Sequence, residues 1–372
     1  MAASAYNDRT IRTTAPATPP AGTRRYYDLQ AGGYFMDADG LPILYAPRPS
    51  APAPPMPTPS PSNVRYVSAV SPAGLASDGL SWGTAWLDFN RIAWQALPSP
   101  CLIYVDGGPS GMTYRSTLDV QASFVTVQRS NEPGRSGPIT IDGGRMNPLP
   151  RWGDPAYVFA GNPFGPGINI RAVSNVLLDF GGWGGLTVQH CQGEGIRMDP
   201  GSVNVTMNGI DIVDCGLALQ STGAADQVPA AGLWFADRPG CLPGGSGHTF
   251  RRMRIHDCGE DAFQTDAGGF HDSTFDLCIF SNTRLRADGL PYAAERHPDA
   301  AQLYGGPMSG ITFSRSWFGS HLLQGVAMGD QVNAVQKVSF ADCVFQGCYG
   351  FAVADNGGPP SNGWSFLRCS ID

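Results

Sequence analysis

The sequence predicts an all-β solenoid of short parallel strands, and two observations support this fold class. First, a unit of strand, tight turn and strand returns several times between residues 204 and 356. The second strands of these units align at residues 195–198, 216–219, 261–264, 299–302, 325–328 and 350–353. Second, Asp299 and Gly325 lie 26 residues apart, and Gly325 and Gly350 lie 25 apart. A repeat of this length built from short strands is typical of a solenoid.

The alignment also predicts the core. Stacked coils about 4.8 Å apart would place aligned residues in columns along the solenoid. We expect two inward columns, the first made of Ile196, Leu217, Ala262, Ala300, Val326 and Phe351, and the second of Met198, Leu219, Met328 and Val353. Asp261 and Asp299 are 38 residues apart, so we expect an insertion in that coil.

Composition narrows the function classes. The 48 Gly and 32 Pro, with only 15% charged residues, fit a chain of many turns. The net charge is −7 and the basic residues form no stripe, which argues against a nucleic-acid partner. No apolar run approaches the length of a membrane span. The nine cysteines contain no CxxC pair, and we expect buried free thiols, with Cys215, Cys258 and Cys348 in one column.

Residues 1–63 are predicted to form an arm. Two proline-rich stretches, residues 13–20 and 48–62, cannot build a core. Between them, residues 26–45 are rich in aromatic residues and predict a β-hairpin with an apolar face. Such a hairpin on two tethers suits docking to another protein. The docking residues would be Tyr26, Tyr27, Tyr34, Phe35, Leu41, Ile43, Leu44 and Tyr45.

The main domain is predicted to span residues 64–372 and to open with an N-terminal cap at residues 64–105. A strand at 64–68 precedes a short amphipathic helix at 81–96. The residues on one face of this helix at helical spacing are Trp86, Phe89, Ile92, Ala93 and Ala96. We expect the helix to cover the open end of the first coil and to prevent edge-to-edge pairing.

This arrangement of repeats behind an entry cap resembles the right-handed parallel β-helix of the pectate-lyase-like superfamily. The handedness is implied by the resemblance and not by the spacing. That superfamily includes polysaccharide lyases, some glycosidases, sugar epimerases and phage tailspikes. The resemblance therefore implies a glycan as ligand or substrate. Trimerisation, common in tailspikes, is likewise only implied.

The inserted coil carries the strongest candidates for chemistry. Alignment places Asp261 beside Asp299 and Gln264 beside Gln302, with His297 at the mouth of the inserted loop. Two carboxylates about 5 Å apart could share a Ca²⁺ ion, act as acid and base, or serve a retaining glycosidase. The predicted catalytic residues are Asp261, Asp266, His297 and Asp299, and the predicted substrate-binding residues are Glu260, Arg296, Tyr304 and Asp330. No cofactor is required by this prediction, and Ca²⁺ is an option.

A structural interpretation of the same residues stays open. Asp at a β-helix turn often caps backbone N–H groups, and stacked Gln side chains form ladders between coils. Gln264 and Gln302 are expected to point the same way as Met198 and Met328, in a buried ladder. Arg296 also falls in no lyase motif, and the acidic cluster of pectate lyases is only partly present.

The function predicted from these features is that of a bacteriophage virion surface protein, such as a tailspike, a fibre-like protein or a capsid-decoration component. The arm would contact other virion proteins while the exposed β-helix binds host polysaccharide. The N-terminal residues contain no apolar signal segment, so we expect synthesis in the host cytoplasm without export. The alternative is a polysaccharide lyase or glycoside hydrolase, and the sequence leaves open whether the chain is an enzyme.

Overall fold

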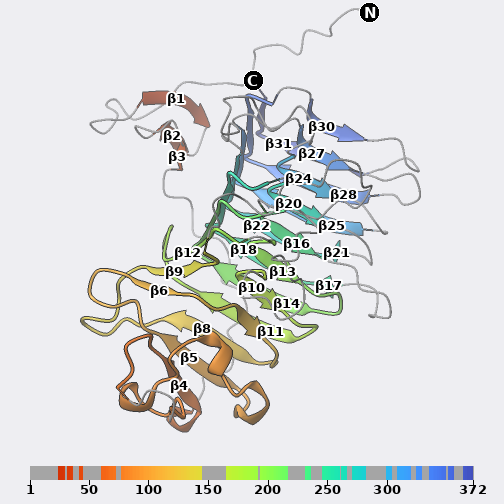
Figure 1. The fold of residues 1–372 in the computed structure, drawn as a ribbon. Coiled ribbons are helices and arrows are strands. Elements are labelled where there is room, and N and C mark those ends of the chain that lie inside the picture. The colour runs from red at the N-terminus through yellow and green to blue at the C-terminus, as the bar shows by residue number, and fades with distance from the viewer. Residues whose placement is uncertain are drawn as a thin grey trace, which may run out of the picture.

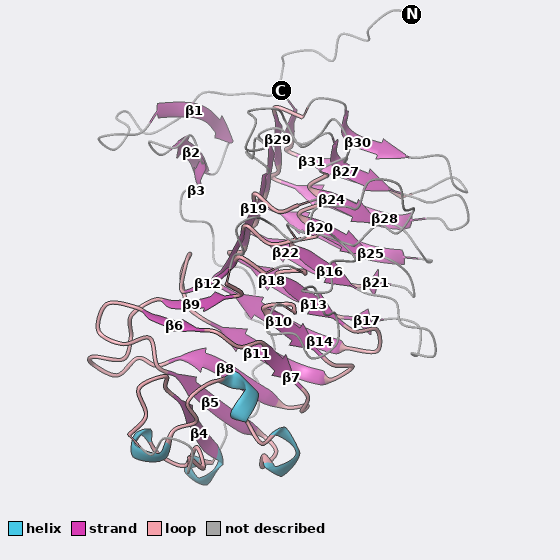
Figure 2. Cartoon of the chain, in the orientation of Figure 1, coloured by secondary structure: helices cyan, strands magenta, loops and turns pink. Residues whose placement is uncertain are grey.

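The fold is a stack of β-coils in a computed structural model (Figure 1). The model describes residues 24–29, 32–36, 42–44, 60–72, 77–144, 165–191, 193–216, 231–235, 245–259, 261–265, 270–281, 299–303, 308–319, 324–328, 335–348, 351–355 and 363–371. For the first three of these segments only the backbone is considered. Strands account for most of the ordered elements, and four described 3₁₀ turns, beginning with η1 (Pro61–Asn63), cluster at one end of the stack (Figure 2).

Three parallel sheets run along the stack. The eight-stranded sheet contains β7 (Leu118–Val120), β10 (Ile168–Ile170), β13 (Ile196–Met198), β16 (Leu233–Phe235), β20 (Phe263–Thr265), β24 (Ala301–Leu303), β27 (Gln324–Met328) and β30 (Phe351–Asp355). The nine-stranded sheet contains β6 (Met112–Tyr114), β9 (Ile139–Asp142), β12 (Leu186–Gln189), β15 (Ile210–Val213), β19 (Arg254–His256), β23 (Ile279–Ser281), β26 (Trp317–Gly319), β29 (Val344–Gln346) and β32 (Ser370–Ile371).

The twelve-stranded sheet contains β4 (Val64–Val67), β5 (Cys101–Val105), β8 (Val125–Arg129), β11 (Ser174–Asp179), β14 (Val203–Asn208), β17 (Gly245–Ser246), β18 (Thr249–Arg251), β21 (Phe270–His271), β22 (Thr274–Asp276), β25 (Met308–Ser314), β28 (Val335–Ala341) and β31 (Ser365–Leu367). From β9 onward, each coil adds strands to all three sheets, and each strand pairs in parallel with those of the adjacent coils. The predicted parallel β-helix is therefore confirmed.

The inward columns match the prediction at Ile196 and Val326 and at Met198 and Met328, and they differ at the other described positions. Strand register places Ile196 opposite Leu233, Phe263 opposite Ala301, and Ala301 opposite Val326. The structure thus puts Phe263 and Ala301 in the column where the alignment placed Ala262 and Ala300. Phe351 lies opposite Gln324, and it is Val353 that lies opposite Val326. The alignment predicted a strand at residues 216–219, but the strand of this coil in the eight-stranded sheet is β16, at residues 233–235. Residues 217–219 lie outside the described part of the chain. Because side chains alternate between the faces of a strand, a one-residue shift exchanges inward and outward positions.

A stack of phenylalanine rings fills the core beneath the twelve-stranded sheet. Phe250, Phe275, Phe313, Phe340 and Phe366 occupy one column on successive strands. Consecutive ring centroids lie 4.6, 4.9, 5.2 and 4.8 Å apart, with interplanar angles of 16° or less. The register of the strands is thus matched by ring stacking inside them.

The predicted capping helix is wrong. Three 3₁₀ turns replace it, namely η3 (Trp82–Thr84), η4 (Phe89–Arg91) and η5 (Trp94–Ala96). Asp88 and Ala93 have non-helical backbone angles and interrupt any continuous helix. Trp86, Phe89 and Ile92 are buried as expected, but Ala93 and Ala96 are exposed and Trp94 is buried in their place. The chain therefore covers the end of the first coil by alternating turns with extended residues.

The corner between the twelve-stranded and nine-stranded sheets has two forms. In the later coils it contains only one or two residues, and the first of them has positive φ, as at Gly209 (76°), Arg252 (48°), Leu277 (57°), Arg315 (49°), Asp342 (55°) and Arg368 (52°). In the early coils the same corner is longer, at residues 106–111, 130–138 and 180–185. The fold itself therefore needs no more than one or two residues here.

The arm contributes a separate sheet. Strands β1 (Arg24–Leu29), β2 (Gly32–Met36) and β3 (Pro42–Leu44) pair antiparallel in that order. The predicted hairpin is thus a three-stranded sheet, which spans most of the predicted docking residues, while Leu41 and Tyr45 lie outside the described residues. In the described part of the chain, no helix has the length and apolar character that would let it cross a membrane.

The described cysteines are free thiols, as expected. Cys191, Cys215 and Cys258 each follow a strand of the nine-stranded sheet by two residues and are buried, whereas Cys348 is only partly buried. Burial raises the pKa of Cys215 and of Cys258 above that of an ordinary thiol. These thiols therefore act as small core residues.

Candidate functional site

The outer face of the eight-stranded sheet carries one column of polar and aromatic side chains. Strand register aligns Asp119, Asn169, Arg197, Trp234, Gln264 and Gln302 on β7, β10, β13, β16, β20 and β24. The neighbours of Asn169 along its strand, Ile168 and Ile170, are fully buried in the core. Since side chains alternate along a strand, the column faces away from the core.

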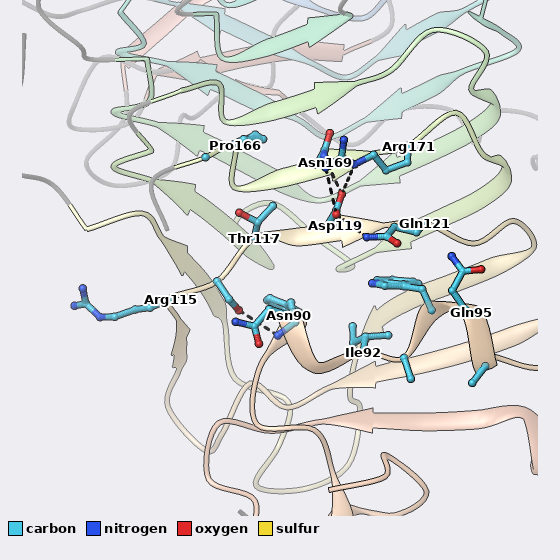
Figure 3. Close-up of a pocket in the computed structure, with 16 residues that line it drawn as sticks. Asn90, Ile92, Gln95, Arg115, Thr117, Asp119, Gln121, Pro166, Asn169 and Arg171 are labelled. Atoms are coloured by element: carbon cyan, nitrogen blue, oxygen red, sulfur yellow. Dashed lines mark hydrogen bonds and ion pairs between the residues drawn. The ribbon is translucent and has the colours of Figure 1, made fainter. Parts of the chain in front are cut away.

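A groove of about 730 Å³ lies against the first part of this column (Figure 3). Turns η4 and η5 of the cap form one wall, and β7 and β10 with their flanking residues form the other. A hydrogen bond from the Phe89 N–H to Ser116 Oγ (3.1 Å) ties η4 to the segment before β7. Polar residues that line the groove include Asn90, Gln95, Arg115, Asp119, Gln121, Asn169 and Arg171.

Asp119 organises the polar wall of this groove (Figure 3). Its carboxylate accepts hydrogen bonds from Asn169 Nδ2 (2.8 Å), Arg171 Nε (2.7 Å) and Gln121 Nε2 (2.7 Å). The hydrogen bond to Asp119 raises the pKa of Arg171. Arg171 therefore neutralises Asp119. Arg115 is exposed and forms no ion pair within the described residues, so it leaves the groove with excess positive charge.

Asn169 presents an acceptor without a donor. The residue is only 4% exposed, and its Nδ2 is already bound to Asp119. Its Oδ1 receives no hydrogen bond from any residue that the structure describes. A buried carbonyl oxygen left unpaired costs about 1–3 kcal/mol, so a ligand hydroxyl or N–H would bind there favourably. The groove wall is thus suited to a hydroxylated ligand.

The column continues past the groove as a charged and aromatic cluster. The Arg197 guanidinium lies 4.6 Å from the centre of the Trp234 ring, a cation–π contact. Asp199 lies 3.4 Å from Arg197 Nε and 3.9 Å from Arg171 Nη1, which links the cluster to the groove. Trp234 Nε1 has no acceptor among the described residues. Arg197 and Trp234 are both more than nine-tenths buried.

The sequence interpretation missed this column. Its signal is a triplet with a polar or aromatic residue between two apolar residues, as in Leu118-Asp-Val, Ile168-Asn-Ile, Ile196-Arg-Met and Leu233-Trp-Phe. The alignment offset the coils at Asp261 and Asp299 by one residue. It therefore placed Gln264 and Gln302, which belong to this outward column, among the core positions.

Asp261 and Asp299 lie on adjacent coils, as the alignment predicted. Asp261 Oδ1 accepts a hydrogen bond from the Asp299 backbone N–H (2.8 Å), and both residues are 1% exposed. This contact is the backbone capping that the structural interpretation describes. Neither residue lines the groove. Their catalytic role stays a prediction.

Gln264 and Gln302 are directly opposite one another, as expected. Their direction was wrong, because Met328 lies opposite Leu303 and Gln302 lies opposite Ala327. Both glutamines therefore belong to the outward column and not to the column of Met198. The remaining predicted site residues lie outside the described residues, namely Glu260, Asp266, Arg296, His297, Tyr304 and Asp330. They stay predictions.

Two histidines lie between carboxylates at the outer edge of the nine-stranded sheet. His190 Nδ1 lies 3.1 Å from Asp142 Oδ1, and its Nε2 lies 3.7 Å from Asp214. His256 Nδ1 lies 2.8 Å from Asp257 Oδ2, and its Nε2 lies 3.4 Å from Asp211. Burial lowers the pKa of His256, but Asp211 and Asp257 outweigh burial and raise it to about 9. These contacts link successive coils.

The sequence prediction allows a Ca²⁺ ion at the inserted coil. Among the residues that the structure describes, no three His, Cys, Asp or Glu side chains are grouped so that they could hold a metal ion. The two carboxylates that would share Ca²⁺ in the sequence prediction, Asp261 and Asp299, are described, whereas the neighbouring Glu260 and Asp266 lie outside that part of the chain. The Ca²⁺ option therefore stays a prediction about the inserted coil.

No protein-family model matches this chain, and no curated protein matches it in sequence. Solved structures similar to it include pectate lyase Pel9A, at 12% identity and a TM-score of 0.46 over 83% of this chain and 76% of that one. A rhamnogalacturonan lyase has 11% identity and a TM-score of 0.43 over 82% and 86%. The surface adhesin PfbA of Streptococcus pneumoniae has 11% identity and a TM-score of 0.33 over 74% and 86%. These similarities concern the fold.

Proposed function

We propose that this chain binds a polysaccharide along the outer face of its eight-stranded sheet, beginning in the groove beside the cap. The unpaired, buried Oδ1 of Asn169 in the groove wall is the observation that carries this proposal. A sugar hydroxyl can donate to this oxygen and occupy a groove of this size. Aligned residues on neighbouring strands are about 4.8 Å apart, close to the length of a sugar unit, which suits a polymer crossing the strands.

The charge of the groove favours a sugar that carries a carboxylate. The protein as a whole is acidic, at −7, and would repel an acidic polymer. Among the described residues that line the groove, Arg115 and Arg171 are accompanied by one carboxylate, that of Asp119, while Asp199 lies 3.9 Å from Arg171 outside the lining, so the charge of the described lining is positive. Guanidinium groups bind carboxylates through paired hydrogen bonds. The positive charge of the groove therefore attracts an acidic polymer, whereas the net negative charge of the protein repels it.

Replacing Arg115 tests the groove. We expect Arg115→Ala to weaken retardation in native gels that contain polygalacturonate or alginate by about threefold to tenfold, the usual range for an exposed charge contact. Arg91→Ala is the matched control, since Arg91 is an exposed arginine of η4 that does not line the groove. Equal retardation of Arg115→Ala and Arg91→Ala would contradict the proposal.

The arm supports a more specific proposal, that the protein is a component of a bacteriophage virion. Strands β1 to β3 form a sheet that is separate from the three sheets of the β-helix and is rich in aromatic residues in sequence. A small sheet on proline-rich tethers is suited to docking on another virion protein. The β-helix would then present the groove to host polysaccharide.

Cleavage of the bound glycan is the alternative. Asp261 and Asp299 lie on adjacent coils, which is the observation in its favour. Asp261→Asn and Asp299→Asn keep the side-chain shape and should abolish depolymerisation if these carboxylates are catalytic. Retained depolymerisation in both folded variants would remove these residues from the mechanism.

A further inference from the structure

The corner loop at residues 180–185 exposes a tryptophan that the fold does not need. Later coils turn the same corner with one or two residues. Here the chain inserts Gly181, Gly182, Trp183, Gly184 and Gly185 between β11 and β12. Trp183 is 42% exposed and does not belong to the hydrophobic core. The exposed indole offers one apolar ring face to a ligand.

Hydrogen bonds hold the backbone of the loop on both sides of Trp183. The Gly181 N–H donates to Asp179 Oδ1 (3.0 Å), and Asn208 Nδ2 donates to the Gly181 carbonyl (3.1 Å). The Gly185 N–H closes a turn on the Gly182 carbonyl (3.1 Å). A Cβ atom at Gly209 of the next coil would lie 2.6 Å from the carbonyl oxygens of Gly181 and Gly182, so that glycine leaves room for the loop. An aromatic ring on a pre-organised turn loses little entropy on binding.

The surroundings of Trp183 leave it accessible to a flat ligand. Cβ atoms built on Gly182 and Gly184 would meet nothing within 4 Å, so the space beside the loop is open at both glycines that flank Trp183 in sequence. The Arg129 guanidinium lies beside Gly181, 3.3 Å from the place where its Cβ would be. Within the described residues Arg129 has no ion pair or hydrogen bond, and its donors are available to a ligand.

We propose that Trp183 and Arg129 form a second saccharide-binding site, in which the indole stacks on the face of a sugar ring and the guanidinium binds its oxygens. The site lies at the corner between the twelve-stranded and nine-stranded sheets, whereas the groove lies on the eight-stranded sheet. A sugar ring needs one aromatic face and a few polar groups. A stable protein partner would need roughly 1,000 Å² with an apolar centre. Trp183 has no exposed large hydrophobic neighbour in the same loop.

Phe124 provides a matched control for the test. It is also 42% exposed, but it lies at the start of β8, at the opposite end of the strand from the corner. Wild-type protein, Trp183→Ala and Phe124→Ala would be run in native gels that contain polygalacturonate, alginate, laminarin or dextran. We expect the apparent dissociation constant for at least one polymer to rise about fivefold in Trp183→Ala and to stay unchanged in Phe124→Ala. Equal binding by all three proteins, or no retardation of the wild type by any polymer, would overturn the proposal.

A second measurement separates this site from the groove. In protein labelled with 5-fluorotryptophan, Trp183→Phe identifies the fluorine resonance of Trp183. We expect this resonance to shift on adding the polymer that binds, both in the wild type and in Arg115→Ala. A Trp183 resonance that does not move while the polymer binds would assign binding to the groove alone. Shifts that vanish in Arg115→Ala would show that Trp183 has no independent site.

Discussion

At the scale of single residues, the charged contacts outside the groove stabilise the stack of coils. His256 lies between Asp211 and Asp257, and Arg254 also pairs with Asp211. The imidazolium thus neutralises one carboxylate of the preceding coil, Asp211, and one of its own turn, Asp257. Together with the pair of Arg171 and Asp119 in the groove, these contacts show that several acidic side chains in the described part of the chain hold the coils together. Only the groups left without partners are available to a ligand.

His256 should make stability depend on pH. The folded state raises its pKa from 6.5 to about 9. A raised pKa stabilises the folded protein fully below about pH 6.5, and this stabilisation is lost as the pH rises through about 9. We expect His256→Gln to cost about 2 kcal/mol of unfolding free energy at pH 6 and less than about 1 at pH 9.5, measured by urea unfolding. His271→Gln is the control, since His271 Nδ1 contacts Ser309 Oγ. A gap between wild type and His256→Gln that widens with pH would contradict this account.

At the scale of elements, the ring stack and the cap determine which faces are available. The phenylalanine column sets the register of the twelve-stranded sheet from within. The turns η4 and η5 close the first coil and also build one wall of the groove. A continuous helix at residues 81–96 would have buried Ala93 and Ala96, both of which line the groove in the structure. The irregular cap thus creates the binding surface.

Shortening one ring of the stack should destabilise the β-helix. Phe313 is fully buried and stacks on Phe275 and Phe340, at 4.9 and 5.2 Å. We expect Phe313→Leu to lower the unfolding free energy by about 2 kcal/mol, through lost stacking and a small cavity. Phe366→Leu serves as the comparison, because Phe366 is 46% exposed and stacks on Phe340 from one side. Urea unfolding that shows an equal loss for both variants would exclude a stacking contribution.

At the scale of the whole molecule, the solenoid separates the proposed sites along one axis. The groove lies beside the cap, and the Trp183 loop lies in an early coil on another face. The inserted coil with Asp261 and Asp299 follows further along the stack. Since each coil contacts only its neighbours, insertions at one coil leave the others undisturbed. A polymer could therefore contact two faces of the same stack and gain affinity from both.

The arm should be separable from this stack. The first β-helix strand, β4, begins at Val64, and its pairing with β5 involves no arm residue. We expect a variant that lacks residues 1–59 to keep its thermal unfolding midpoint within about 2 °C, because it retains every strand of the three parallel sheets. The same variant should fail to enter virions. Normal incorporation would contradict the docking proposal, and a large loss of stability would show that the arm belongs to the core.

The repeat spacing by itself determined the fold class, because the strand length, the turn residues and the return of the pattern about every 25 residues are local properties. The same pattern placed Asp261 on the coil beside Asp299 and Gln264 opposite Gln302. It could not establish which of two adjacent residues faces the core. Strand alternation makes that choice depend on pairing across coils, and strands β14 to β19 separate residues 195–198 from residues 261–264 in sequence.

Only the tertiary structure decided where ligands could bind. Asp119, Asn169 and Arg197 are far apart in sequence, at spacings of 50 and 28 residues, and become neighbours through parallel pairing. The unpaired Oδ1 of Asn169 and the exposure of Trp183 are properties of packing, which no periodicity reveals. Sequence pattern specifies the local conformation of each coil. The stacking of coils specifies which side chains meet. Contacts between coils bring together residues that are distant in sequence, which lowers the conformational entropy of the chain, and only burial of the complete core offsets this loss.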